Sequence, residues 1–343
     1  MSYKSILIIK PSSLGDVVHT LPAVAAIREA YPRAKITWVI NPEWAPLLRG
    51  NRDVDHVHIF PRAELRGITA SLNMLPWIIK TRALRPEVAV DFQGLLRSAL
   101  IGRISRARKL FGLSDAREGS RLFYDEVAQV DRRGHSVERY LKLAELLGAM
   151  SHPILRFPLP TGDPLPRFDP HPAFILLHPF ARGRGKSLTP RAIEDFSRAC
   201  GETRVVVVGK SKLRLRAPGN CVDLTNQTTL LQLVWLIRAT RLTVSVDSGP
   251  MHIAAAVSPH LISIHTWTDP RTVGPHNSEA WIWRNGDLRP MRDFTAGENL
   301  ARGRRFRAAD VPALMELVHC IIDNVSRCDK VVDAKVEDDS GSA

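Results

Sequence analysis

The sequence predicts an α/β fold made of two doubly wound halves, and three observations lead to this prediction. Residues 242–246 alternate apolar side chains and run into a turn and a helix that begins near Pro250, as a buried strand does in a layered α/β protein. The same order of strand, loop and helix opens the chain at residues 6–30. Residues 151–172 contain seven prolines, which is typical of a linker, so two halves are expected on either side of it.

The composition is that of a globular protein that works in a reducing compartment. The 343 residues are 44% hydrophobic and 24% charged, which suffices for two domains with cores of their own. The first apolar run is short and ends at Lys10, so it is no signal peptide, and no apolar stretch is long enough to span a membrane. Four cysteines without C-x-x-C spacing are expected to be reduced. We therefore expect a cytoplasmic location.

The net charge of +13 indicates an anionic partner, since 48 lysines and arginines face 35 carboxylates. Arginines recur within residues 97–108 and 302–307. Aromatic residues make up only 6%, and the sequence contains no known nucleic-acid-binding motif, so nucleic acid is not expected as a partner. Phosphorylated substrates or an anionic membrane face are the expected partners, although a basic surface can also be merely solvated.

The first half alternates predicted strands and helices. Strands are expected at residues 6–9, 35–40, 57–60 and 88–92, and helices at 17–30, 68–84, 95–104 and 135–147. The loop after the first strand contains Ser13, Gly15 and Asp16 but no G-x-G-x-x-G, which argues against a dinucleotide site. Asp16 follows the carboxyl end of that strand, where it could serve a ligand or merely cap the helix.

Asp53 and Asp55 form a D-x-D pattern, which metal-dependent sugar-nucleotide enzymes use. His56 and His58 stand beside it, so a metal site is conceivable. However, alternation places both histidines opposite Val57, which is equally consistent with the solvent face of a strand.

The second half repeats the pattern. Strands are expected at residues 173–177, 204–208, 242–246 and 261–265, and helices from 190, at 230–239, at 251–257 and at 310–325. The expected domains are residues 1–155 and 170–309, with a helix at 310–328 that returns to the first domain and a disordered acidic tail at 329–343.

Two loops of the second half carry groups suited to a diphosphate. The first is rich in glycine and arginine and ends at Lys186 and Ser187, just before the expected cap at Thr189. The second places Asp247, Ser248, Gly249, Pro250 and His252 at the start of a helix, where free N–H groups favour phosphate. A solvated loop and an ordinary strand–helix connection remain the alternatives.

Two Rossmann-like halves with ligand loops at their strand ends predict a cleft between two sheets, which is the GT-B arrangement of glycosyltransferases. In such a protein the first domain would bind the acceptor and the second the sugar nucleotide. Arg97 in the basic helix of the first half could face a phosphorylated acceptor or a membrane.

The sequence resembles the heptosyltransferase family, glycosyltransferase family 9. The matching stretches are ILIIKPSSLGDVVHTLPAVAAIREAYP from residue 6, VAVDFQGLLRSAL from 88, HSVERYLKL from 135, VSVDSGPMHIAAA from 244 and TDPRTVGP from 268. The resemblance implies that Asp16 is the general base on the acceptor hydroxyl and that Lys186 holds the donor diphosphate. It also implies that the segment from Asp247 to His252 binds the sugar nucleotide.

The resemblance implies an inverting transferase that moves heptose from ADP-heptose to the inner core of lipopolysaccharide, without a metal or another cofactor. The acceptor would be a phosphorylated glycolipid, bound near Ser13, Gly15 and Arg97. Such an enzyme would be cytoplasmic, where it could bind peripherally to the inner membrane.

Two departures from the family pattern leave the donor open. Gly209 is followed by Lys210-Ser211-Lys212, where many members have a carboxylate for the ribose, and the loop at residues 265–268 lacks a glycine. The alternatives are a different nucleotide sugar or acceptor on the same fold, or a non-catalytic protein that binds anionic lipid or nucleic acid.

Overall fold

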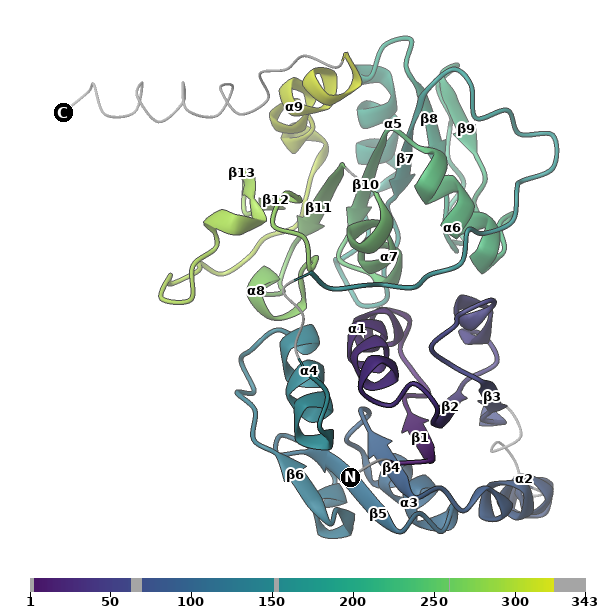
Figure 1. Cartoon of the computed structure of the whole chain (residues 1–343). Coiled ribbons are helices and arrows are strands. Elements are labelled where there is room, and N and C mark those ends of the chain that lie inside the picture. The colour runs from purple at the N-terminus through teal and green to yellow at the C-terminus, as the bar shows by residue number, and fades with distance from the viewer. Residues whose placement is uncertain (1–2, 63–69, 151–153, 259, 324–343) are drawn as a thin grey trace. The chain divides into compact units, whose positions relative to one another are not determined.

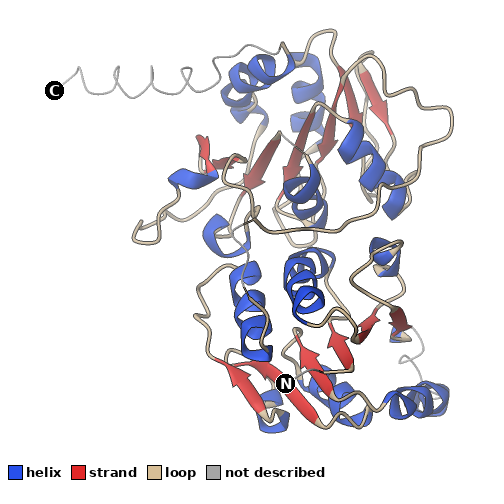
Figure 2. Ribbon diagram, viewed as in Figure 1, coloured by secondary structure: helices blue, strands red, loops and turns tan. Residues whose placement is uncertain are grey.

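The chain divides into two compact units, Met1–Pro160 and Thr161–Ala343. The computed structural model describes residues 3–62, 70–150, 154–258 and 260–323. Figure 1 labels the helices and strands along the chain, and Figure 2 shows that each unit is an α/β structure with a central sheet flanked by helices.

Unit 1 is built on a parallel six-stranded sheet with the order β3-β2-β1-β4-β5-β6. Its strands are β1 (Ser5–Ile9), β2 (Lys35–Ile40), β3 (His56–Ile59), β4 (Val88–Asp91), β5 (Lys109–Leu113) and β6 (Glu126–Ala128). Its helices are α1 (Leu14–Ala30), α2 (Ala70–Leu84), α3 (Leu96–Ile104) and α4 (Ser136–Leu147), with short 3₁₀ turns at Ala45–Leu48 and Ser120–Phe123. The strand order reverses between β1 and β4, which is the place where open α/β sheets bind ligands.

The central strands of unit 1 are apolar on both faces because helices cover both. Leu7 and Ile9 of β1 pack with Trp77 of α2 and Ile101 of α3 on one face. Helices α1 and α4 pack against each other on the other. Helix α1 begins at Leu14, three residues before the expected start, and continues through Pro22 without a break.

Unit 2 repeats this topology with one added strand, in the order β13-β12-β11-β10-β7-β8-β9. Its strands are β7 (Phe174–His178), β8 (Arg204–Val207), β9 (Cys221–Asp223), β10 (Leu242–Val246), β11 (Leu261–His265), β12 (Trp281–Arg284) and β13 (Asp287–Pro290), of which β13 is antiparallel. Its helices are α5 (Pro190–Ala199), α6 (Leu230–Ala239), α7 (Gly249–Val257), α8 (Pro270–Val273) and α9 (Pro312–Ile322), with 3₁₀ turns at Met291–Asp293 and Ala308–Asp310. The order reverses between β7 and β10.

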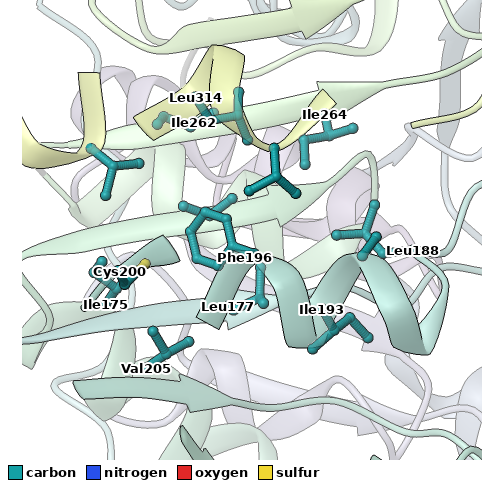
Figure 3. Packing of buried hydrophobic residues seen from close by; sticks show 14 of the residues in the cluster. Ile175, Leu177, Leu188, Ile193, Phe196, Cys200, Val205, Ile262, Ile264 and Leu314 are labelled. Carbon is teal, nitrogen blue, oxygen red and sulfur yellow. The ribbon is translucent and has the colours of Figure 1, made fainter. Parts of the chain in front are cut away.

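Helix α9 belongs to the core of unit 2. Its Leu314 and Val318 are fully buried in a cluster with Phe196 of α5 and with sheet residues such as Ile175 and Ile264. Figure 3 shows several members of this cluster between the sheet and the helices. The expected return of this helix to the first half is therefore not what the structure shows, because its apolar stripe covers the sheet of unit 2 instead.

Several short strands were not anticipated from the sequence. Strands β5, β6, β9, β12 and β13 have three to five residues each, and the four-residue helix α8 was not predicted either. Such short elements carry little periodicity of their own. The expected tail at residues 329–343 and the end of the last expected helix lie outside the described residues.

Two further findings concern membrane-spanning helices and the state of the cysteines. No helix among the described residues is long and apolar enough to cross a membrane. Cys200 and Cys221 are free thiols, whereas Cys320 is disulfide-bonded, so the expectation of reduced cysteines fails at Cys320.

The packing of α9 leads to a prediction about stability. Leu314→Ala should lower the free energy of unfolding by about 2–5 kcal/mol, because it leaves a cavity in a fully buried position. Hydrogen exchange followed by mass spectrometry should show faster exchange in peptides from β7, β10 and α5, with no change in β1 and β4. His319→Ala, on the exposed side of the same helix, is the control. Faster exchange in β1 rather than in β7 would contradict the assignment of α9 to unit 2.

Candidate functional site

Asp16 lies in the first turn of α1, just beyond the carboxyl end of β1. Its Oδ2 accepts hydrogen bonds from the Ser13 backbone N–H, at 3.0 Å, and from the Ser13 hydroxyl, at 2.6 Å. The capping role that the sequence left open is therefore present. The side chain is 36% exposed, so capping does not remove it from solvent or from a ligand.

The other oxygen of Asp16 faces a buried cation and a buried phenol. Tyr140 of α4 donates its hydroxyl to Asp16 Oδ1 at 3.3 Å, and Lys10 Nζ lies 3.8 Å from the same oxygen. Lys10 is only 2% exposed and donates to the Tyr140 hydroxyl at 2.7 Å and to the Phe92 carbonyl at 2.9 Å. The Asp16 carboxylate is therefore partly exposed, while its Oδ1 interacts with Lys10 and Tyr140 inside the protein.

Asp91 ends β4 beside this cluster and organises the next loop. Its Oδ1 accepts from the backbone N–H groups of Gln93 and Gly94, and its Oδ2 accepts from the hydroxyls of Ser98 and Tyr124. Burial raises the pKa of Asp91, against these hydrogen bonds, which lower it. With no exposed surface, this carboxyl has a structural role.

The other candidate residues of the first half differ in their exposure and in their contacts. Gly15 is buried in the first turn of α1, and Ser13 is exposed at its cap. Arg97 is exposed on α3 and stacks over the Phe60 ring at 5.7 Å. Arg103 is engaged with Asp125 at 3.1 Å.

In the D-x-D pattern, the carboxylate of Asp55 is engaged by groups of the protein. Asp55 pairs with Arg28 at 2.6 Å and accepts from the Ile36 N–H, and burial, which raises its pKa, is outweighed by these two contacts. His58 bonds to the Thr81 hydroxyl at 2.8 Å. Among the described residues no three His, Cys, Asp or Glu side chains are grouped as metal ligands.

In unit 2 the two expected loops meet at the reversal between β7 and β10. Lys186 Nζ donates to Asp247 Oδ2 at 2.6 Å, and the two side chains are 25% and 10% exposed. Gly185 precedes Lys186 with φ +82°, and an added Cβ there would lie 2.8 Å from Arg305 Nε. A glycine is therefore needed at this point, and Arg305 lies against the same loop.

Thr268 and His265 extend this pair. Thr268 donates its hydroxyl to Asp247 Oδ2 at 2.7 Å, and His265 Nδ1 lies 3.1 Å from the Thr268 oxygen. Because the Thr268 proton is directed at Asp247, Nδ1 of His265 must carry the hydrogen, which leaves Nε2 as an acceptor. Burial lowers the pKa of His265 to about 4, so the ring is neutral near pH 7.

Asp247 is held in its charged form. Burial alone would raise its pKa, but His265, which is charged only in acid, and the hydrogen bonds from Lys186 and Thr268 outweigh burial and lower it. Asp247 is therefore charged near pH 7, where it accepts the hydrogen bond from Lys186.

Helix α7 begins beside this ion pair. Ser248 is its N-cap, and Gly249 and Pro250 open the helix. The Ser248 hydroxyl lies 3.2 Å from His178 Nδ1, and burial lowers the pKa of His178 to about 4, so this ring is neutral too. His252 lies in the first turn and is 9% exposed.

Ser187 and the turn after Gly209 hold backbone in place. The Ser187 hydroxyl accepts from the Ala181 N–H at 3.0 Å and closes the Gly/Arg loop. The turn after Gly209 is closed by Asn226, which accepts from the Ser211 N–H at 3.1 Å and donates to its carbonyl at 2.6 Å. Thr189 caps α5 as expected, accepting from the Ala192 N–H at 3.2 Å.

Sequence reasoning missed five members of these clusters. They are Lys10, Tyr140, His178, His265 and Thr268. The first three were within stretches already noted, at the ends of β1 and β7 and in the HSVERYLKL segment, so their position at a strand end or in a shared segment was the available signal. His265 and Thr268 also lie in a stretch already noted, the loop at residues 265–268, but their hydrogen bonds around Asp247 are visible only in the structure.

Comparisons with known proteins agree with this architecture. Residues 80–173 and 200–302 match the family model for glycosyltransferase family 9 (heptosyltransferase). The chain is 27% identical over 307 residues to lipopolysaccharide heptosyltransferase 1 of Salmonella typhimurium, covering 78% of this chain and 90% of that protein. It is 28% identical over 298 residues to the Pseudomonas aeruginosa protein of the same name, covering 79% and 81%.

Solved structures show the same fold at lower identity. E. coli heptosyltransferase WaaC with ADP has a TM-score of 0.72 and 20% identity, covering 91% of this chain and 99% of that one. E. coli ADP-heptose lps heptosyltransferase II has a TM-score of 0.72 and 22% identity, covering 93% and 99%. These likenesses identify the fold as GT-B, with two Rossmann-like units. Together with the family match, they show that the chain is a glycosyltransferase and belongs to glycosyltransferase family 9, the heptosyltransferases.

Proposed function

We propose that the chain transfers heptose from ADP-heptose to the inner core of lipopolysaccharide, with Asp16 as the general base. The names of its relatives supply the donor and the acceptor class. The observation that carries the proposal is the chemistry at the two strand-order reversals. Unit 1 exposes a carboxylate at this place, and unit 2 exposes an ammonium group beside a helix N-terminus.

A general base is needed because a sugar hydroxyl is a weak nucleophile. In the proposed reaction the acceptor oxygen attacks the anomeric carbon of the heptose, its proton passes to Asp16, and the bond from that carbon to the diphosphate breaks. A single displacement of this kind inverts the anomeric centre, and it requires one base and no enzyme nucleophile. Asp16 has a partly exposed carboxylate to take the proton.

The departing ADP gains negative charge, and Lys186 with the start of α7 offsets it. We assign the phosphate contacts to Lys186, to the Ser248 hydroxyl and to the backbone N–H of Gly249, with Pro250 shaping the turn. Asp247 would repel a phosphate, so its part is to hold Lys186 in place and to accept from sugar hydroxyls. Ser187 keeps the loop closed, and His252 lies in the first turn of the same helix.

We assign the acceptor to unit 1. Ser13 is exposed next to Asp16, Gly15 adds no side chain between them, and Arg97 offers a guanidinium to an acceptor phosphate. The basic surface that Arg97 shares with its neighbours would also suit contact with anionic lipid, which is worth about 1 kcal/mol per basic residue near a membrane.

A different nucleotide sugar is the second candidate for the donor. It is favoured by the turn after Gly209, where Lys210, Ser211 and Lys212 offer no carboxylate to a ribose. A panel of nucleotide sugars in the transfer assay distinguishes the two.

The base assignment predicts that Asp16→Asn lowers kcat by about 10²–10⁴-fold, the usual contribution of a positioned base. Asparagine keeps an oxygen for Ser13 but no longer opposes the charge of Lys10, so a modest fall in melting temperature is also expected. The measurement is ADP release from ADP-heptose with a heptose-deficient lipopolysaccharide acceptor, below that melting temperature. Donor affinity, measured by calorimetry, should barely change. A folded variant with near-normal turnover would show that the base lies elsewhere.

Lys186→Ala should lower kcat/KM by about 10²–10³-fold, because one strong electrostatic donor to the leaving group is lost. Donor affinity should fall as well. Arg184→Ala is the matched control, since it removes a positive charge from an exposed position of the same loop and leaves the contact with Asp247 intact. Equal losses in the two variants would mean that the loop acts only through its general charge.

We also propose that the reaction needs no metal ion, since a lysine and a helix N-terminus already offset the charge of the diphosphate. The initial rate should therefore be the same with EDTA and with added Mg²⁺. A rate abolished by EDTA and restored by Mg²⁺ would refute this part of the proposal.

A further inference from the structure

Lys10 is a buried ammonium group beside an apolar strand. It follows β1 directly and is 2% exposed, although the last four residues of that strand, 6–9, are isoleucine and leucine. Burying such a charge costs several kcal/mol unless partners surround it. Its partners are the Phe92 carbonyl, the Tyr140 hydroxyl and, at 3.8 Å, the carboxylate of Asp16.

The direction of the hydrogen bonds follows from the chemistry of the groups. An ammonium group can only donate, so the Tyr140 oxygen accepts from Lys10. The Tyr140 proton is then free to point at Asp16 Oδ1, 3.3 Å away. Lys10, Tyr140 and Asp16 form a directed chain, in which the positive charge of Lys10 polarises the phenol toward the carboxylate.

We propose that Lys10 and Tyr140 are positioning residues that keep Asp16 ionised and fix the orientation of its carboxylate toward the acceptor. This inference rests on the proposed role of Asp16 as the base. Ser13 binds Oδ2 from the helix cap, and Tyr140 binds Oδ1 from α4, so the carboxylate is held at both oxygens. Rotation about its last bond would break contacts on both sides.

Lys10 forms an ion pair with Asp16 at 3.8 Å, and other charged groups lie around this pair. Asp91 of β4 and Asp115 favour the charged form of Lys10, and Arg139 of α4 opposes it but is paired with Asp115 at 2.5 Å. The rings of His19 on α1 and His135 at the start of α4 pack 4.9 Å apart in the same interface. Burial lowers the pKa of Lys10 and raises that of Tyr140, so the phenol keeps its proton.

The test removes the Tyr140 hydroxyl and measures the ionisation of Asp16. Tyr140→Phe keeps the ring, which packs edge-on against Phe92 at 5.6 Å, and deletes the hydroxyl, which donates to Asp16 and accepts from Lys10. Losing a donor to the charged form should raise the pKa of Asp16 by roughly 0.5–1 pH unit. The acid limb of log kcat/KM should move to higher pH by the same amount, because the base must be ionised to act.

Tyr124→Phe is the matched control. Tyr124 also donates its hydroxyl to a carboxylate of unit 1, Asp91, at 2.8 Å, so the control deletes an equivalent bond away from Asp16. It should leave the titration of Asp16 and the acid limb unmoved. Lys10→Met is a second variant, which should move both in the same direction as Tyr140→Phe, provided that it folds.

The pKa of Asp16 is measured directly by carbon NMR of protein labelled at aspartate, with the signal assigned by its loss in Asp16→Asn. This readout does not depend on activity. An unmoved Asp16 titration in Tyr140→Phe would overturn the inference. A raised Asp16 pKa with an unmoved acid limb would instead support the network around Asp16 and contradict its role as the base.

Discussion

Parallel pairing of the central strands is the constraint on which both charged clusters depend. In unit 1, Ile9 of β1 pairs with Asp91 of β4, so Lys10 comes next to the carbonyl of Phe92 although 82 positions separate them. In unit 2, the pairing of β7 with β10 aligns Ser245 with His178 and brings Lys186 to Asp247. With antiparallel pairing, the loops that follow two neighbouring strands would lie at opposite ends of those strands.

Burial then decides what each cluster can do. The neutral rings of His178 and His265 take part in hydrogen bonds without adding charge near pH 7, so the charge contributed by the hydrogen-bonded pair at this reversal is that of Lys186 and Asp247. In unit 1 the buried Asp91 carboxylate accepts four hydrogen bonds, which hold the loop after β4 in place. Asp16 and Lys186 are partly exposed, which is why we propose that they meet the substrates.

Much of the fold could be predicted because the long elements carry a clear periodicity. The bounds predicted for β2, β10, β11 and α6 agree with the structure to the residue. The short strands β9 and β13 were missed because three or four residues contain too little pattern, and their place depends on the sheet that they extend. The packing of α9 in unit 2 was not predicted, because an amphipathic pattern does not specify which apolar surface the helix will cover.

The candidate site was predictable only in part. Asp16, Lys186 and Asp247 follow strands or open helices, so their positions can be inferred from local sequence. Tyr140 is different, because it lies 124 positions from Asp16 on a helix whose packing partner the sequence does not specify. Whether a charged side chain is buried or exposed depends on the tertiary structure. The sequence around Lys10 and Lys186 does not show that the first is buried and the second partly exposed.

The two ion pairs at equivalent topological places have opposite polarity, and this difference follows from which partner is buried. In unit 1 the lysine is 2% exposed and the carboxylate 36%, so the pair presents a negative group to solvent. In unit 2 the lysine is 25% exposed and the carboxylate 10%, so the pair presents a positive one. A transfer reaction from a diphosphate needs a base for one substrate and a cation for the other. One repeated topology can therefore serve both halves of the proposed chemistry, because the sequence of each unit buries a different member of the same kind of pair.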